Sequence, residues 1–150
     1  MAKELAMTGN GERHSPFNVT HERISLVLVD DYPAYLELIC SVLEFEQRLE
    51  VIGKANDGKQ ALRAVRKLRP QLVLMDVNIP RMGGLRAARL IAACFPEVKI
   101  ALMSAEESPL LREKCFACGA HAFISRRQFR EDFAMAVEQI FPRHHATKAA

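Results

Sequence analysis

Three acidic side chains stand directly after apolar runs of the sequence: Asp30 and Asp31 follow the run 24–29, and Asp76 follows the run 72–75. If these runs are strands whose ends meet, the three carboxylates share one pocket. Like charges that close cannot all stay ionised without a cation. An all-oxygen site open to water favours a hard cation, and a small number of carboxylates with remaining waters favours Mg²⁺ over Ca²⁺.

Two more polar residues follow later apolar runs. Ser104 comes after the run 98–103 and can donate a hydroxyl hydrogen bond, whereas Arg126 comes after 122–125 and carries a fixed positive charge. Phosphoryl transfer needs mainly positioning and neutralisation of the phosphoryl oxygens. Carboxylates are known nucleophiles that form acyl phosphates. The set therefore indicates a site for phosphoryl chemistry.

A simpler interpretation exists for each aspartate taken alone. An aspartate after a strand is often only the N-cap of the next helix, and Asp31, two residues before Pro33, fits that role. Polar residues in register after four different strands are not explained by capping. The combined set therefore favours the phosphoryl site.

The elements that must position these residues alternate along the chain. Strands are predicted at 24–29, around 51–52, and at 72–75, 98–103 and 122–125. Each is followed by a helical stripe of apolar residues with cap or stop signals. The stripes run over 36–43, from Asp57 to Pro70, from Leu85 to Pro96, from Ser108 to Gly119 and from about 128 to 141.

This alternation predicts an α/β fold, a doubly wound parallel sheet of five strands with helices on both faces, (βα)₅. The strand order 2-1-3-4-5 is adopted from the flavodoxin-like fold class. In such sheets ligands bind at the carboxyl ends of the strands, where the winding reverses. That point lies between the first and third strands, where Asp30, Asp31 and Asp76 are expected.

Length and composition agree with a single domain. The 150 residues are 49% hydrophobic and 26% charged, which is typical of a globular protein. We expect a flexible arm over 1–23, one domain over 24–141 and a polar tail over 142–150. The net charge of +3 is too small to indicate nucleic-acid binding by itself.

Neither a membrane span nor a secretory signal is visible in the sequence. No apolar run reaches the length of a span, and the first ten residues lack the apolar core of a signal peptide. A cytoplasmic location is therefore expected. With nine residues after Phe141, no DNA binding by this chain itself is expected.

Four segments resemble the receiver domains of bacterial two-component response regulators, and the resemblance covers about 24–141. The segments are 28–31 (LVDD), 74–84 (LMDVNIPRMGG), 102–105 (LMSA) and 119–126 (GAHAFISR). Each is weak alone, but their order and spacing make the resemblance specific. They look most similar to receivers of transcription regulators with a helix-turn-helix output.

The resemblance implies a role for each matching residue of the acidic pocket. Asp76 would be the phosphoacceptor. Asp30 and Asp31 would be the acid pair, one binding Mg²⁺ directly and the other through water. Asn78 would supply its backbone carbonyl to Mg²⁺, and Ser104 would hydrogen-bond the phosphoryl group.

The resemblance also implies how a signal would leave the pocket. Phe123 matches the switch aromatic that rotates inward once Ser104 moves, and Asn78 and Glu106 match two positions that tune dephosphorylation. A histidine kinase or phosphotransfer protein would donate the phosphoryl group. The fourth helix, fifth strand and fifth helix would form the partner or homodimer surface. Such a domain is not an enzyme, because it assists only its own phosphorylation and dephosphorylation.

One residue departs from the family pattern, because Arg126 stands where the family has lysine. Arginine supplies charge and bidentate phosphate contact, but its planar fork is not a compact ammonium. Phosphorylation is expected to survive this exchange, whereas its coupling to the switch is left open. Arg127 would serve instead if the fifth strand ended one residue later.

Two other classes of function compete with a phosphorylated receiver. A degenerate receiver would act as a phosphorylation-independent interaction module, and Arg126 is the only feature in its favour. A phosphatase or hydrolase with an aspartate nucleophile commonly has a second acid two residues on. Asn78 stands at that position, which argues against the hydrolase.

Overall fold

The computed structural model describes residues 22–143, so nearly all of the predicted arm and most of the predicted tail lie outside the described residues. The strands are β1 (Ile24–Val29), β2 (Leu49–Ala55), β3 (Leu72–Asp76), β4 (Lys99–Ser104) and β5 (Ala122–Ser125). The helices are α1 (Pro33–Leu43), α2 (Gly58–Leu68), α3 (Gly84–Cys94), α4 (Pro109–Ala117) and α5 (Phe129–Ile140). A short 3₁₀ turn, η1 (Arg126–Gln128), joins β5 to α5.

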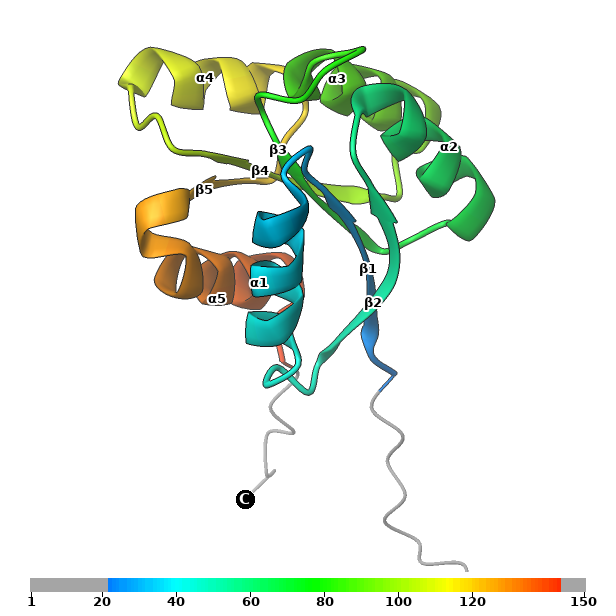
Figure 1. The fold of residues 1–150 in the computed structure, drawn as a ribbon, viewed down its shortest axis with the longest axis vertical. Helices are drawn as coiled ribbons and strands as arrows, with labels where there is room; N and C mark the ends of the chain where they lie inside the picture. Colours follow the sequence, from blue (N-terminus) through cyan, green and yellow to red (C-terminus); the bar gives the residue numbers. More distant parts are fainter. Residues whose placement is uncertain (1–21, 144–150) are drawn as a thin grey trace, which may run out of the picture.

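The strands form one parallel sheet in the order β2-β1-β3-β4-β5, which confirms the predicted fold class and strand order. Helices α1 and α5 cover one face of the sheet, and α2, α3 and α4 cover the other (Figure 1). Val29 pairs with Met75 across β1 and β3. The next residue of each strand, Asp30 and Asp76, therefore reaches the same edge of the sheet.

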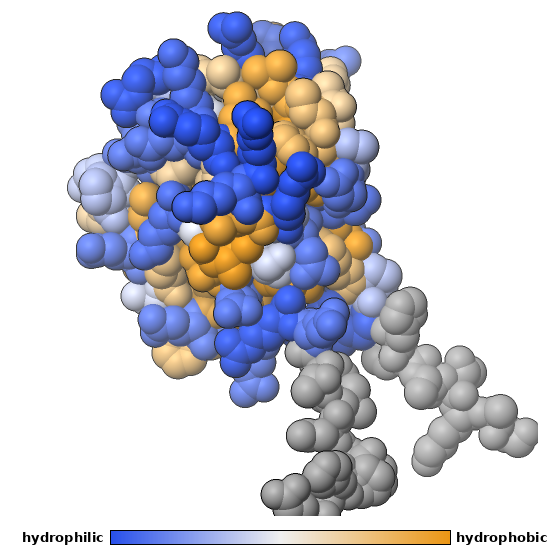
Figure 2. Space-filling model, turned by 90° about the vertical axis from the view of Figure 1, so that its right-hand side faces the viewer, coloured by the Kyte–Doolittle hydropathy of each residue, from blue (hydrophilic) through white to orange (hydrophobic). Residues whose placement is uncertain are grey.

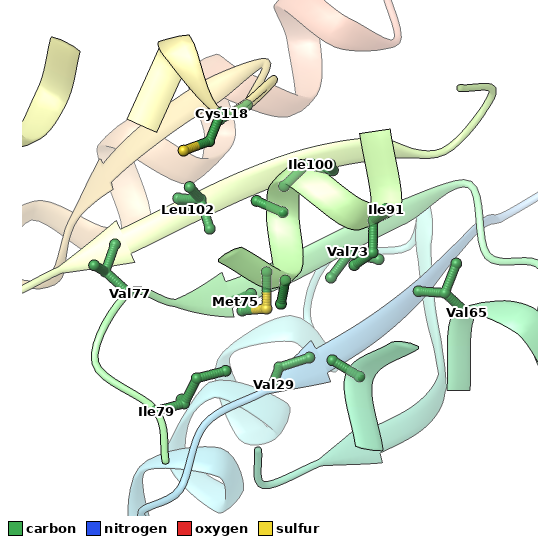
Figure 3. Close-up of a cluster of buried hydrophobic side chains, with 14 of the residues drawn as sticks. Val29, Val65, Val73, Met75, Val77, Ile79, Ile91, Ile100, Leu102 and Cys118 are labelled. Atoms are coloured by element: carbon green, nitrogen blue, oxygen red, sulfur yellow. The ribbon is translucent and has the colours of Figure 1, made fainter. Parts of the chain in front are cut away.

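Alternation along the buried strands divides the core into two layers, because successive strand side chains point to opposite faces. Val27, Val73 and Ile100 belong to the layer packed with Val65 of α2 and Ile91 of α3 (Figure 3). The opposite layer takes the intervening strand residues and packs them against α1 and α5; it includes Leu26, Leu28, Leu72, Leu74, Met103, Ile39 and Phe133. Burial on both faces explains why the central strands are continuously apolar.

Local signals in the sequence mark several helix ends correctly. The Asp57 carboxylate accepts a hydrogen bond from Gln60 N at 2.8 Å, and the Ser108 hydroxyl accepts one from Leu111 N at 3.2 Å. Gly119, just beyond α4, has a φ of 97°, which favours glycine. These contacts confirm the helix starts expected at Asp57 and Ser108 and the helix end expected at Gly119.

The start of α1 differs from the simpler interpretation of Asp31. Tyr32 is the N-cap residue, no side chain in the described part of the chain makes a cap hydrogen bond there, and Pro33 opens the first turn. Asp31 is therefore not a helix cap, and its exposed side chain needs another account. At the other end of the chain α5 begins at Phe129, because residues 126–128 form the 3₁₀ turn.

The surface beside α2 and the edge strand β2 is mostly hydrophilic, with apolar areas between the charged side chains (Figure 2). Among residues 22–143, β2 pairs with β1 alone and so lies at the edge of the sheet. Its exposed Glu50 and Lys54 place charges on this strand, which disfavour pairing with another chain. No helix in residues 22–143 combines the length and apolarity needed to cross a membrane.

Leu74 tests the two-layer core, because its side chain is 0% exposed in the central strand β3. Leu74→Ala should lower the free energy of unfolding by about 2–5 kcal/mol, since it removes buried contacts and leaves a cavity. Chemical denaturation with a circular-dichroism signal measures the change. Leu38→Ala on α1 is the control: that side chain is 58% exposed, so a change within about 0.5 kcal/mol is expected. Equal losses would contradict the described core.

Candidate functional site

Two buried carboxylates meet at the carboxyl ends of the central strands. Asp30 follows β1 and is 0% exposed, and Asp76 ends β3 and is 3% exposed. The parallel pairing of β1 with β3 brings them to one edge. This is the place where the winding reverses, between the strands that are adjacent in the sheet but not in the chain.

Arg126 links the two carboxylates through a single nitrogen. Its Nη2 donates a hydrogen bond to Oδ2 of Asp30 and lies 2.6 Å from Oδ2 of Asp76. The arginine comes from η1, directly after β5. Arg127 is exposed to solvent. The residue that reaches the carboxylates is therefore Arg126, and β5 ends at Ser125 as predicted.

Backbone amides bind the other oxygen of each carboxylate. Tyr32 N donates to Asp30 Oδ1 at 2.9 Å, and Asn78 N donates to Asp76 Oδ1 at 2.6 Å. In both cases the donor lies two residues after the aspartate. Each carboxylate is thus oriented by its own chain on one side and by Arg126 on the other.

Tyr35, in the first turn of α1, completes the surroundings of Arg126. The Arg126 guanidinium carbon lies 4.0 Å from the centroid of the Tyr35 ring, within the range of a cation–π contact. Tyr35 was not among the residues predicted from the sequence. Its position one helical turn after the acid pair was the available signal, since the start of α1 must lie near the end of β1.

Burial and charge act in opposite directions on the two acids. Burial raises the pKa of Asp30 and of Asp76 above the usual value for an aspartate, although the neighbouring guanidinium and the backbone amides favour the charged forms. Burial also raises the pKa of the Tyr35 phenol. The ionised forms of the two buried aspartates are therefore costly, and the neighbouring Arg126 stabilises them.

The loop after Asp76 is fixed by close packing and by an ion pair. A Cβ atom on Gly84 would lie 2.3 Å from the carbonyl oxygen of Asp76, so only glycine fits there. Gly84 N donates to Val77 O at 2.9 Å. From the same loop, Arg81 Nε lies 2.7 Å from Oδ2 of the buried Asp57. The N-cap of α2 therefore also holds the loop that follows the candidate phosphoacceptor.

Ser104 ends β4 beside this edge, and its side chain is 0% exposed. Its hydroxyl oxygen accepts a hydrogen bond from Glu106 N at 3.0 Å. The exposed Glu106 side chain accepts one from Ser108 Oγ at 2.9 Å. The start of the loop between β4 and α4 is therefore tied to Ser104 by this hydrogen bond.

The end of β5 is held by acidic side chains that the sequence analysis did not single out. Ser125 Oγ donates to the carboxylate of Glu107, and Ser125 N donates to Oδ2 of Asp132 at 2.9 Å. Ser125 is also the register partner of Ser104. These contacts set the place from which Arg126 enters the pocket.

Phe123 lies on β5 and is 8% exposed. Arg112 of α4 lies over it, with its guanidinium carbon 5.6 Å from the ring centroid, and lies 5.7 Å from the ring of Phe116. Phe116 is 43% exposed. These side chains border a hollow of about 150 Å³ between α4, β5 and α5.

Asp31 and Asn78 stand at the margin of the pocket, because both side chains are exposed. Asn78 contributes through its backbone, as the amide bond to Asp76 shows. Within residues 22–143 no group of three or more His, Cys, Asp and Glu side chains is close enough to hold a metal ion. The converging donors are therefore two carboxylates, Asp30 and Asp76, rather than three.

A family model described as the response regulator receiver domain matches residues 26–138. The matched stretch begins inside β1 and ends inside α5, so it includes most of β1, the other four strands and every residue of the pocket. The chain belongs to the response regulator receiver domain family, a family of signalling domains.

Curated relatives agree with this assignment. The response regulator GacA of Pseudomonas aeruginosa is 30% identical over 118 residues, which cover 79% of this chain and 55% of GacA. The transcriptional regulatory protein DegU of Brevibacillus brevis is 26% identical over 122 residues, covering 81% of this chain and 52% of DegU. The chain thus spans about half the length of these relatives.

Solved structures agree as well. A two-component response regulator of the LuxR family from an Aurantimonas species has a TM-score of 0.75 and 26% identity, with 79% of this chain and 85% of that chain covered. The response regulator domain of Thermotoga maritima CheB has a TM-score of 0.70 at 24% identity, covering 79% and 94%. The CheB likeness shows the shared fold.

The Asp57–Arg81 pair makes stability depend on pH in a defined direction. The amide of Gln60 and the guanidinium of Arg81 hold the pKa of Asp57 below its ordinary value of 3.8. The ionised form therefore stabilises the fold above that pH, and the contribution disappears as the pH falls through the lowered pKa. Asp57→Asn should lower the denaturation midpoint at pH 7, and the gap to wild type should close in acid.

The measurement is a set of urea unfolding curves between pH 7 and about pH 3, a range that spans the usual aspartate pKa. Glu97→Gln is the control, because its pair with Arg69 is exposed on both sides and should matter little. A gap between wild type and Asp57→Asn that stays constant with pH would contradict the role of this carboxylate.

Proposed function

We propose that the chain accepts a phosphoryl group on Asp76 from a histidine kinase or a phosphotransfer protein in two-component signalling. The observation that carries this proposal is the two-sided hold on Asp76, whose oxygens lie 2.6 Å from Asn78 N and 2.6 Å from Arg126 Nη2. A carboxylate fixed in this way at the sheet edge is oriented for attack on phosphorus.

In the proposed reaction an Asp76 oxygen attacks the phosphorus of a phosphohistidine. A P–O bond forms, the P–N bond breaks, and the histidine nitrogen leaves with its electron pair. The Ser104 hydroxyl then donates to the phosphoryl group, and Arg126 neutralises its charge. The chain acts on its own phosphoryl group only and is not an enzyme for other substrates.

The donor set at the pocket suits a divalent cation. Oδ2 of Asp30 and Oδ2 of Asp76 converge on one positively charged nitrogen, and hard oxygen donors of this kind suit Mg²⁺. We propose that Asp30, Asp76 and the backbone carbonyl of Asn78 hold Mg²⁺, with Asp31 acting through water. The ion would supply charge neutralisation for the phosphoryl oxygens.

Ser104 and Phe123 are proposed as the switch. Ser104 is tied to the β4–α4 loop through Glu106. Phe123, on the neighbouring strand β5, lies under Arg112 of α4. A Ser104 drawn toward a phosphoryl group would release space for Phe123 to turn inward and would shift the population of the α4–β5–α5 face. Asn78 and Glu106, both exposed beside the pocket, are proposed to tune dephosphorylation.

The α4–β5–α5 face is the proposed partner or homodimer surface. It carries the exposed Phe116 and the hollow beside it, and aromatic side chains of this kind are enriched in interfaces. The receiver is proposed to extend over residues 24–141, preceded by the arm over 1–23 and followed by the tail over 142–150. No DNA contact by this chain is proposed, and a cytoplasmic location stays a prediction of the sequence.

One observation favours a second candidate function. Arg126 binds both acids directly and so satisfies the pocket without a phosphoryl group. A receiver stabilised in this way can act as a phosphorylation-independent interaction module. The experiment below separates the two functions.

Phosphorylation of Asp76 can be tested by incubating the protein with acetyl phosphate and Mg²⁺. Wild type should gain the mass of one phosphoryl group, and Asp76→Asn should gain none, because an amide is not a nucleophile of this kind. Intact-mass spectrometry measures both. Glu131→Gln, an exposed acid at the start of α5, should label like wild type.

Two results would decide against parts of this proposal. A wild-type protein that stays unlabelled while another receiver is labelled in parallel would favour the phosphorylation-independent module. Labelling of Asp76→Asn to the wild-type level would show that another residue is the acceptor.

The proposed dimer surface can be tested with beryllofluoride, which mimics the phosphoryl group. Beryllofluoride with Mg²⁺ should shift wild type toward the dimer in light scattering after gel filtration. Phe116→Ser should raise the dimer dissociation constant by about tenfold, the effect of losing one well-placed interface side chain. Phe45→Ser, at an 87% exposed site outside this face, should leave the dimer unchanged. A wild type that labels but stays monomeric would contradict the homodimer.

A further inference from the structure

We propose that Arg126, seated on Tyr35, is the resident cation of the acidic pocket, and that a divalent cation reaches Asp30 and Asp76 only by displacing it. This inference deepens the proposed function, because it assigns the control of metal entry to two residues of this chain. The exchange is between a guanidinium and a metal ion at one seat, so no covalent bond changes.

Nη2 of Arg126 and a divalent cation would occupy the same position between Asp30 and Asp76. Oδ2 of Asp30 and Oδ2 of Asp76 both face Nη2 of Arg126. The other oxygen of each acid is already bound to a backbone amide. A cation that binds the Oδ2 atoms of both carboxylates would enter where Nη2 lies, and two cations in contact there would repel each other strongly.

Arg126 is held in the pocket by another contact besides its ion pairs. The Tyr35 ring lies under the guanidinium at 4.0 Å, and arginine stacks on aromatic faces where an ammonium cannot do so in a planar manner. The Arg126 side chain is only 25% exposed. Tyr35 is thus a positioning residue that raises the occupancy of the seat by Arg126.

The Arg126 side chain can leave its position between the two acids and return to it. Nε of Arg126 is buried and, within residues 22–143, is the only buried side-chain nitrogen or oxygen without a hydrogen-bond partner. A buried N–H without a partner carries a desolvation cost that water would remove. Turning outward through the exposed part of its side chain would hydrate this N–H, which offsets part of the loss of its contacts with Asp30, Asp76 and Tyr35.

The expected consequence is a lowered apparent affinity for the metal ion. When the binding-competent state is populated in only a fraction of molecules, the apparent dissociation constant rises by the inverse of that fraction. A seat that is free of Arg126 in about one molecule in ten gives about a tenfold rise. Weakening the contact of Arg126 with Tyr35 should recover part of this affinity.

The direct test monitors Arg126 while the full chain is titrated with Mg²⁺ alone. ¹⁵N NMR should show the Arg126 Nε–H signal changing at the same Mg²⁺ concentrations as the amides of Tyr32 and Asn78, which donate to the two acids. An Arg126 signal that stays constant while both amides respond would overturn the proposal, because the metal ion would then bind beside a seated arginine.

Tyr35→Leu is the decisive variant, because it removes the aromatic ring and leaves every charge in place. Its dissociation constant for Mn²⁺, measured by electron paramagnetic resonance, should fall by about threefold to tenfold, as expected for the loss of a cation–π contact. Phe45→Leu is the control, because it also removes an aromatic ring, at an 87% exposed site outside the acidic pocket, and it should leave the dissociation constant unchanged. Equal Mn²⁺ affinity of Tyr35→Leu and wild type would overturn the proposal.

Arg126→Gln gives the full effect, and it should bind Mn²⁺ at least about tenfold more tightly than wild type. Arg127→Gln removes the same charge from the adjacent exposed residue and controls for the general field. Thermal melts check that each variant is folded. Equal gains in both arginine variants would overturn the proposal in favour of simple charge repulsion, as would no Mn²⁺ binding by any variant.

These metal titrations use no phosphoryl donor, so their result does not depend on whether Asp76 accepts a phosphoryl group. Phosphorylation of Asp76 with an unresponsive Arg126 would leave the function standing and remove the inference. Displacement of Arg126 by Mg²⁺ in a chain that takes no phosphoryl group would do the reverse.

Discussion

Two carboxylates with almost no exposure to water must be neutralised at one edge of the sheet, and the rest of the structure meets this requirement. Burial raises the pKa of Asp30 and of Asp76, so their ionised forms are costly without a cation. Arg126 supplies the charge, and backbone amides after each strand bind the remaining oxygens. The contacts of the acidic pocket therefore serve first to stabilise two buried negative charges.

The parallel sheet makes this arrangement possible, because all five of its strands end at one edge. The order of the strands puts β1 beside β3, and the two apolar layers hold the strands rigidly on both faces. The polar groups of the site then lie at the last residues of the strands and in the loops that follow them. Gly84 and the Asp57–Arg81 pair fix the loop after Asp76, so the site rests on packed elements on both sides.

Features read from local sequence were predicted well, whereas contacts between distant elements were not. The helix starts at Asp57 and Ser108 were predicted correctly because a cap depends on residues within one turn. The strand order came from the fold class, since hydrophobic periodicity does not order strands. Arg126 was predicted at the pocket, but its bridge between two acids and its contact with Tyr35 depend on three elements packing together. Asp31 was expected among crowded carboxylates, yet its exposure follows from the path of the chain into α1.

The departure from the family's lysine gains a physical meaning from Tyr35. A planar guanidinium can stack on a ring while one of its nitrogens binds two carboxylates, and a compact ammonium cannot do both. Arg126 also opens the turn that joins β5 to α5, where Ser125 is held by Glu107 and Asp132. The residue that neutralises the pocket is therefore covalently continuous with the proposed partner face. A change of cation at Asp30 and Asp76 must alter the contacts at that junction, because the same side chain leaves the pocket when the charge is replaced.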